Sequence, residues 1–198
     1  MLPQEVAFNV DSISVTASGG AGGDINITVH DAVKLVAAGG NADAYGIFNN
    51  KGSLAASVTG DITAEATGGA AGGMAPGKKG KGGSYGGIGG DGIAGRNGST
   101  LIGSTAVAVG SYNEAGRSAI QAGDITATVT GGIGSKDADG GEGGTGGYGG
   151  GVGGNGAVGG NGGTGGTGIA AGVQNINGIS LITAAKLSAK ATGGAGGT

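Results

Sequence analysis

The sequence predicts an all-β fold, a β-solenoid (β-helix) of about three to four repeats with glycine-rich, polyglycine-II-like inserts. Three observations predict it: segments that alternate apolar and polar residues, two motifs that recur together, and glycine at every third position between them. The 198 residues include 56 glycines, two prolines and no cysteine, a composition that ordinary globular folds do not have. We expect a single repeat domain over 1–198.

The first motif is a short alternating segment. Four copies align without gaps, starting at Ser12, Asp61, Asp124 and Lys186. The last three starts are 63 and 62 residues apart, and the first two are 49 apart. In the second copy Ile62 and Ala64 alternate with Thr63 and Glu65, which is typical of a half-buried strand. The small inner residues predict a narrow interior.

The second motif follows each insert and holds Gly, Asn and Gly at a fixed spacing. Its copies are Gly46-x-x-Asn49-x-x-Gly52, Gly110-x-x-Asn113-x-x-Gly116 and Gly172-x-x-Asn175-x-x-Gly178. Asn and Gly tolerate positive φ, so each copy predicts a turn that ends a strand. Together the motifs define units at about 11–59, 60–122 and 123–184, and a partial unit at 185–198.

Glycine-rich inserts occupy 68–98 and 131–168. From Gly77 to Gly98 glycine recurs at every third position, which predicts a threefold extended helix that another backbone can approach closely. Collagen would need abundant proline, and Pro76 is the only proline in either insert. A phase slip near Gly151 predicts a turn between side-by-side helices at 140–150 and 152–167. We expect loop tips at 74–79 and 135–139, and ordinary strands at 24–29 and 33–36 in the first unit.

Composition also bounds the function. A net charge of −3 argues against nucleic acid as a partner. No apolar stretch is long enough to span a membrane, and the first residues are not a signal peptide. His30 is the only histidine, and no Ser–His–Asp or Cys–His arrangement can be built around it. We therefore expect no enzymatic activity and no cofactor.

The candidate interaction residues lie in the inserts. Lys78, Lys79, Lys81 and Arg96 make the first insert basic, whereas the second carries Asp137, Asp139 and Glu142. Tyr85 and Tyr148 occupy equivalent triplet positions. Opposite charges on neighbouring inserts could pair within or between molecules. The tyrosines could anchor neighbouring helices or contact a receptor. The charges could equally be solubilising loop tips.

Calcium and ice binding are weaker alternatives. Residues 86–94 fit one copy of a calcium β-roll pattern, but one copy cannot supply both halves of such a site. The three acidic residues of the second insert could hold Ca²⁺ weakly. An ice-binding face would need a flat threonine array, and two charges interrupt the outward row. That row is Thr16, Glu65, Thr128 and Lys190.

The run Gly60-Asp-Ile-Thr-Ala-Glu-Ala-Thr-Gly-Gly69, followed by glycine triplets, resembles the passenger regions of glycine-rich bacterial surface proteins. These are autotransporter-like or hemagglutinin-like adhesins with β-solenoid stalks. The run beginning at Asn161 is similar to mycobacterial glycine-repeat tails, which lack the Asp-Ile-Thr-Ala strands. Glycine-helix bundles of phage tail-tip adhesins and of an arthropod antifreeze protein are further analogues. The resemblance implies an extracellular or cell-surface bacterial protein without enzymatic activity.

The last unit stops before its second motif. Either the chain is a fragment, or its open end stacks on the next molecule, with 6–10 as one side of the joint. We therefore expect a structural protein that self-associates into a fibre or surface layer. The alternative is an adhesin whose inserts bind a cell-surface glycan or protein.

Overall fold

The structure is a computed structural model, which describes residues 5–22, 38–73, 79–92, 103–136 and 138–197. Every regular element in these ranges is a β-strand, so the predicted all-β class is confirmed. The strands are β1 Glu5–Val10, β2 Ile13–Ser18, β3 Ala42–Asn50, β4 Ser53–Val58, β5 Ile62–Thr67, β6 Ala106–Glu114, β7 Arg117–Gln121, β8 Asp124–Thr130, β9 Gly168–Ile176, β10 Ile179–Thr183 and β11 Lys186–Thr192.

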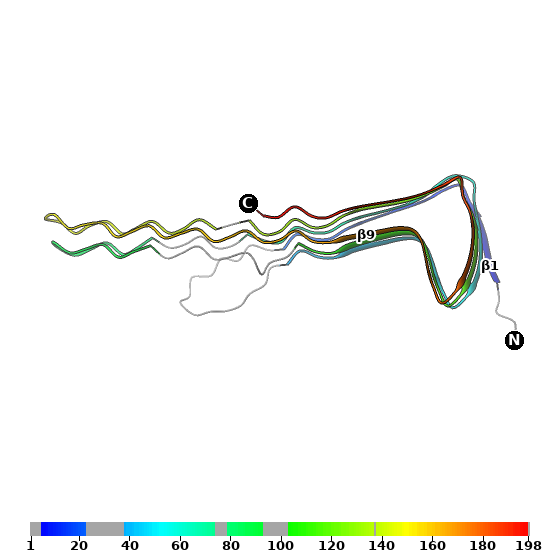
Figure 1. Cartoon of the computed structure of the whole chain (residues 1–198), viewed down its shortest axis with the longest axis horizontal. Helices are drawn as coiled ribbons and strands as arrows, with labels where there is room; N and C mark the ends of the chain where they lie inside the picture. Colours follow the sequence, from blue (N-terminus) through cyan, green and yellow to red (C-terminus); the bar gives the residue numbers. More distant parts are fainter. Residues whose placement is uncertain (1–4, 23–37, 74–78, 93–102, 137, 198) are drawn as a thin grey trace.

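The strands form three parallel sheets. Sheet A has the order β1-β4-β7-β10, sheet B the order β2-β5-β8-β11, and sheet C the order β3-β6-β9. The chain visits sheets C, A and B in turn, and then repeats this path (Figure 1). We call each circuit a pass: β1–β2, β3–β5, β6–β8 and β9–β11. This arrangement is compatible with a β-solenoid.

The sheet register matches the alignment expected from the sequence. Ile13 pairs with Ile62, and Ile62 pairs with Ile125, which pairs with Leu187. The outward row predicted across sheet B is also present. It consists of Thr16, Glu65, Thr128 and Lys190. The two charges therefore interrupt this face as expected.

The core narrows from large to small side chains. Near sheet A it contains Ile47, Val58, Ile62, Ile120 and Ile125. Further along, sheets B and C pack against each other mainly through alanines, among them Ala44, Ala64, Ala108 and Ala127. A Cβ on Gly46 would lie 2.6 Å from Cγ2 of Ile62, so glycine makes room for that isoleucine. In β5 the inward residues are Ile62, Ala64 and Ala66, followed by Gly68, so the side chains between the two layers become smaller toward the glycine insert.

An asparagine ladder forms the corner between sheets C and A. Asn49 Nδ2 donates to Asn113 Oδ1 at 2.9 Å, and Asn113 Nδ2 donates to Asn175 Oδ1 at 2.7 Å. The predicted turns are present, but their glycines do not have positive φ. That conformation belongs to the preceding residues, Lys51, Ala115 and Asn177. Glycine is required at 116 for space, because a Cβ there would lie 2.7 Å from Asn49 Nδ2.

The glycine inserts leave the sheets as two layers, which we call the blade (the described residues within 68–105 and 131–167). Outgoing legs continue from sheet B, and returning legs lead back to sheet C (Figure 1). The expected turn near Gly151 is confirmed, since Gly151 N donates to Gly147 O at 3.1 Å. The first insert reverses at Ser84–Gly87, where Gly87 N donates to Ser84 O at 2.6 Å.

One predicted loop tip is wrong. Ser135 is fully buried, and Ala138 forms a bridge with Gly160, so the described residues 135–136 and 138–139 lie along a leg. A small serine fits between the legs where the sequence suggested a polar loop. For the other predicted tip, Lys79 and Gly80 lie in a leg, and 74–78 lies outside the described residues. The strands expected at 24–29 and 33–36, and His30, also lie outside them.

Candidate functional site

The predicted interaction residues that the structure describes are all exposed on the blade. They are Lys79, Lys81, Tyr85, Asp139, Glu142 and Tyr148. Lys78, Arg96 and Asp137 lie outside the described residues. The blade presents these side chains at regular positions along its legs. In the outgoing leg of the third pass the exposed positions include Lys136, Asp139, Glu142, Thr145 and Tyr148.

Within the described parts of the two inserts, the expected charge pairing is present at one position. Lys79 Nζ lies 3.2 Å from Glu142 Oε2, with the two side chains 58% and 80% exposed. An ion pair this accessible to water contributes little to stability. Among the described residues, no group of three acidic or histidine side chains gathers to hold a metal ion. Asp91 of the calcium-like pattern accepts a 2.8 Å hydrogen bond from Asn155 N.

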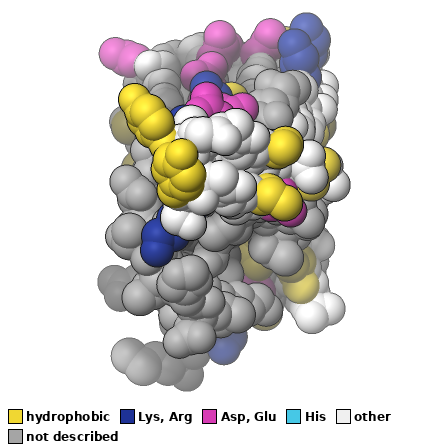
Figure 2. Space-filling model, turned by 90° about the vertical axis from the view of Figure 1, so that its left-hand side faces the viewer, with side chains coloured by type: hydrophobic (Ala, Val, Ile, Leu, Met, Phe, Trp, Pro, Cys, Tyr) yellow, Lys and Arg dark blue, Asp and Glu magenta, His cyan; other side chains and the backbone are white. Residues whose placement is uncertain are grey.

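The two tyrosines lie together at the tip of the blade. Tyr85 is 85% and Tyr148 91% exposed. The two reversals are bonded to each other, since Gly86 N donates to Tyr148 O at 2.7 Å. Figure 2 looks onto this tip and shows hydrophobic side chains there, with acidic side chains above them and basic side chains both above and below.

The glycines of the second reversal position the first tyrosine. Gly149 and Gly150 have φ of 90° and 99°, values that residues with a side chain rarely adopt. A Cβ on Gly149 would lie 3.1 Å from Cζ of Tyr85, so this ring rests against the Gly149 backbone. The sequence indicated both tyrosines and the turn near Gly151, but it placed the loop tips at 74–79 and 135–139 and did not reveal this contact.

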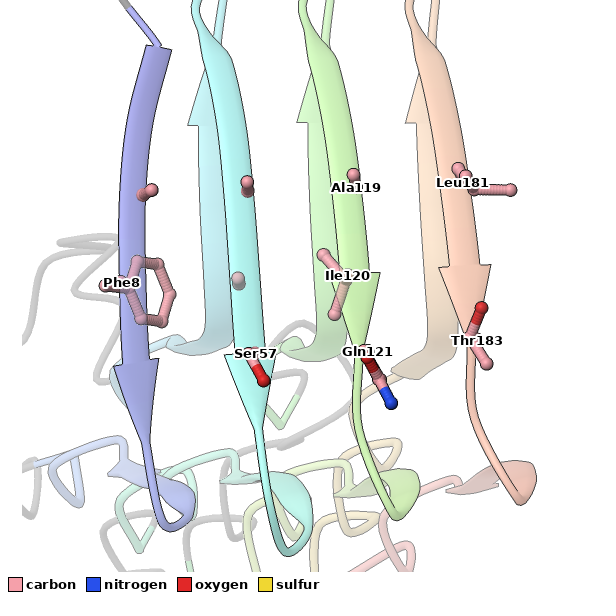
Figure 3. Close-up of a pocket in the computed structure, with 10 residues that line it drawn as sticks. Phe8, Ser57, Ala119, Ile120, Gln121, Leu181 and Thr183 are labelled. Carbon is pink, nitrogen blue, oxygen red and sulfur yellow. The ribbon is translucent and has the colours of Figure 1, made fainter.

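A second surface is the open edge formed by β9, β10 and β11, whose stacking on a second molecule the sequence predicted but whose apolar character it did not. Each row of outward-facing side chains crosses the strands of one sheet. Three such rows carry charged or small side chains in the third pass and large apolar side chains at this edge. Glu114 aligns with Ile176, Arg117 with Ile179, and Ala119 with Leu181. Leu181 is 68% exposed and points away from β7 (Figure 3). Comparison of outward positions between units would have found this change in the sequence.

The two ends of the sheets also carry opposite charges. In the fourth pass, 168–197, the only charged residues are Lys186 and Lys190, both exposed. At the opposite end, 5–22 contains Glu5 and Asp11, both exposed, and no Lys or Arg. The charges at the two ends are therefore complementary in sign.

Sheet A has a shallow depression of about 390 Å³ on its surface. It crosses all four strands (Figure 3), and its residues include Ala7, Ala55, Ala119 and Leu181. None of its ten lining residues is charged or titratable. Such a lining offers shape and apolar contact, but no acid–base groups.

An aromatic cluster covers part of the outer face of sheet C. The Phe48 and Tyr112 rings stack with centroids 5.0 Å apart, and Tyr45 packs edge-on at 5.5 Å from each. Burial raises the pKa of the Tyr112 phenol, and the Glu114 carboxylate raises it further. Phe48 and Tyr112 pair directly across neighbouring strands, so the cluster is typical of cross-strand stabilisation.

No helix able to cross a membrane occurs in the part of the chain that the structure describes. Searches against protein-family models, curated proteins and solved structures find no match to this chain.

Proposed function

We propose that the chain is a β-solenoid with polyglycine-II-like inserts, and that it is an extracellular, non-enzymatic structural protein of bacteria that assembles end to end into a fibre. The observation that carries the assembly is the change from charged or small to large apolar side chains at the open β9–β11 edge. A parallel edge strand offers unpaired backbone groups to another chain, and apolar residues along it favour pairing over exposure to water.

The glycine segments support the polyglycine-II assignment through the directions of their hydrogen bonds. Gly144 N donates at 2.8 Å to Gly90 O in the returning leg of the preceding pass. Gly83 N donates at 2.9 Å to Thr145 O in the neighbouring outgoing leg. A leg that bonds neighbours in more than one direction differs from a β-strand, which bonds within one plane.

The joint follows from continuing the existing register. If β1 of a second copy pairs with β10 in the same register, Ala7 of the second copy lies beside Leu181. A small side chain then packs next to a large one. If β2 pairs with β11, Ile13 follows Leu187 and extends an aliphatic row. Lys186 then lies beside Ser12 and one residue from the Asp11 carboxylate. Sheets A and B make this joint, because the described part of the first pass has no strand in sheet C.

Light scattering over a concentration series, with negative-stain electron microscopy, tests the assembly. We expect fibres that lengthen at low ionic strength, because salt screens the opposite end charges. Leu181→Asp should weaken association at least about tenfold, because it places an unpaired charge in the joint. Val158→Asp is the matched control, since Val158 is 77% exposed on the blade, away from the open edge. A monodisperse monomer at high concentration, without fibres, would contradict the proposal.

A further inference from the structure

We propose that the blade tip is a carbohydrate-binding site, in which Tyr85 and Tyr148 stack against neutral sugar rings. This activity goes beyond assembly, because it uses the far end of the blade and not the sheet edges. The tip is formed by the two reversals, 84–87 and 147–151.

The first argument is the preorganisation of the rings. The Tyr85 ring lies against Gly149, whose positive φ and missing side chain leave the space that the ring occupies. The hydrogen bond from Gly86 N to Tyr148 O fixes the second reversal beside the first. An aromatic ring that is already held in place loses less conformational entropy when a ligand binds, so the entropic cost of binding is lower. Nothing in the packing of the blade requires tyrosine here, since both side chains are almost fully exposed.

The second argument is the charge of the tip. Residues 82–90 and 143–161 contain no charged side chain. The described charges nearest these ranges are Lys81, Asp91 and Glu142, and Glu142 forms an ion pair with Lys79. The available groups are aromatic faces, the tyrosine hydroxyls, and the exposed hydroxyls of Ser84 and Thr145. Aromatic faces attract the positively polarised C–H groups of a sugar ring, and hydroxyls bond its hydroxyls.

The third argument is size. The tip is two passes wide and two layers deep, so its end face is on the order of 100 Å² with neighbouring chains about 5 Å apart. A stable protein–protein interface needs about 800 Å² from each partner. One or two sugar units match this area, and a folded protein surface does not. Weak binding at each tip would gain avidity where several tips face one polysaccharide.

The test uses the full chain and a panel of neutral oligosaccharides of glucose, galactose, mannose and N-acetylglucosamine. Ligands are added to about 10 mM, where even a millimolar complex is populated, and binding is followed by saturation-transfer NMR and calorimetry. We expect at least one oligosaccharide to bind. Tyr85→Ala and Tyr148→Ala should each weaken it about five- to tenfold, because one stacking contact is lost.

The controls keep the outcome specific. Val158→Ala removes an exposed side chain from the same blade, away from the tip, and should leave the affinity unchanged. Tyr85→Phe keeps the ring and should retain most of the binding. Circular dichroism checks that each variant is folded. The proposal is overturned if no oligosaccharide binds, if the alanine variants bind as well as the wild type, or if the tyrosines bind a glycan-free protein instead. None of these results depends on fibre formation, because the measurement is made on the dispersed chain.

Discussion

The three sheets form the body of the molecule, and the blade extends from it. In both regions the backbone groups hydrogen-bond to neighbouring segments, but the side chains of the two regions differ. In the body, strands alternate, and Ile62, Ile125 and Val129 are buried between layers. In the blade, the described buried positions are mostly glycine. The body therefore gains stability from apolar burial, and the blade from hydrogen bonds between closely packed backbones.

The transition between the two regions is gradual. Ile62, Ala64 and Ala66 are followed by Gly68, so the layers approach until no inward side chain remains. At Gly68 an added Cβ would lie 2.7 Å from Ser104 O in the returning leg of the other layer. One continuous pair of layers thus changes from side-chain packing to backbone packing. Substitutions at each end of this gradient should have distinct consequences.

The largest effect is expected from Ile125→Ala in the body. Ile125 is fully buried and has Gly110 opposite it, so the lost volume leaves a cavity that no neighbour can fill. The free energy of unfolding should fall by about 2–5 kcal/mol. Urea denaturation followed by circular dichroism measures it.

Ile125→Val is the graded control and should cost only about 0.5–1.5 kcal/mol. Equal losses for the two variants would mean that the position does not act through buried volume.

An intermediate effect is expected from Gly144→Ala in the blade. Gly144 N donates to Gly90 O, and its carbonyl accepts a 2.8 Å bond from Gly154 N. An added Cβ would lie 2.8 Å from the Lys81 carbonyl carbon and 2.9 Å from Gly80 O. Separating the legs should cost about 1–3 kcal/mol, as overpacking does elsewhere. Hydrogen exchange should show lost protection in the blade amides and unchanged protection in the sheets.

Gly156→Ala is the matched control on the same blade, because its nearest neighbour would be Gly141 O at 3.8 Å. We expect unchanged or slightly higher stability, by about 0.4–1 kcal/mol, since alanine restricts the unfolded chain. If both alanines reduced protection equally, close backbone packing would not be what holds the blade together.

Much of the body could be predicted from local sequence. Alternation at Ile62–Thr67 indicates both the strand and its buried face, and the recurring motifs indicate the register. The tight turns were placed correctly, but the residue with positive φ was not. Lys51 and Ala115 adopt it. The following glycine is required for space: an added Cβ would lie 3.1 Å from Asn49 Oδ1 at Gly52, and 2.7 Å from Asn49 Nδ2 of the preceding pass at Gly116. The contact at Gly116 arises between passes, so the sequence of that turn alone does not reveal it.

The candidate sites were harder to predict because they depend on which side chains the passes bring together. Ser135 and Asp139 looked like a polar loop tip, yet they continue the threefold pattern of a leg. Tyr45 and Tyr112 belong to different positions of the motif, and only their position on neighbouring strands brings the rings together. The apolar edge of β9–β11 became visible only when outward rows were compared across the sheets.

The smallest effect is expected from Lys79→Ala, which breaks the ion pair with Glu142. Both side chains are largely exposed to water, so solvent screening leaves the pair with little net stabilisation. The free energy of unfolding should change by no more than about 0.5 kcal/mol, and blade amides should keep their protection. Hydrogen exchange at low and high salt measures this, with Glu142→Gln as the matched removal of the other charge.

Lys79→Ala could reduce the hydrogen-exchange protection of the blade as much as Gly144→Ala does. That result would contradict the conclusion that backbone packing, and not side-chain charge, holds the blade together. It would mean that side-chain charges hold the legs together, and salt should then loosen the wild-type blade as well. Retained protection in both charge variants, at both salt concentrations, would leave the glycine backbone contacts as the source of blade order. The charges of the inserts would then be free to vary without loss of the blade.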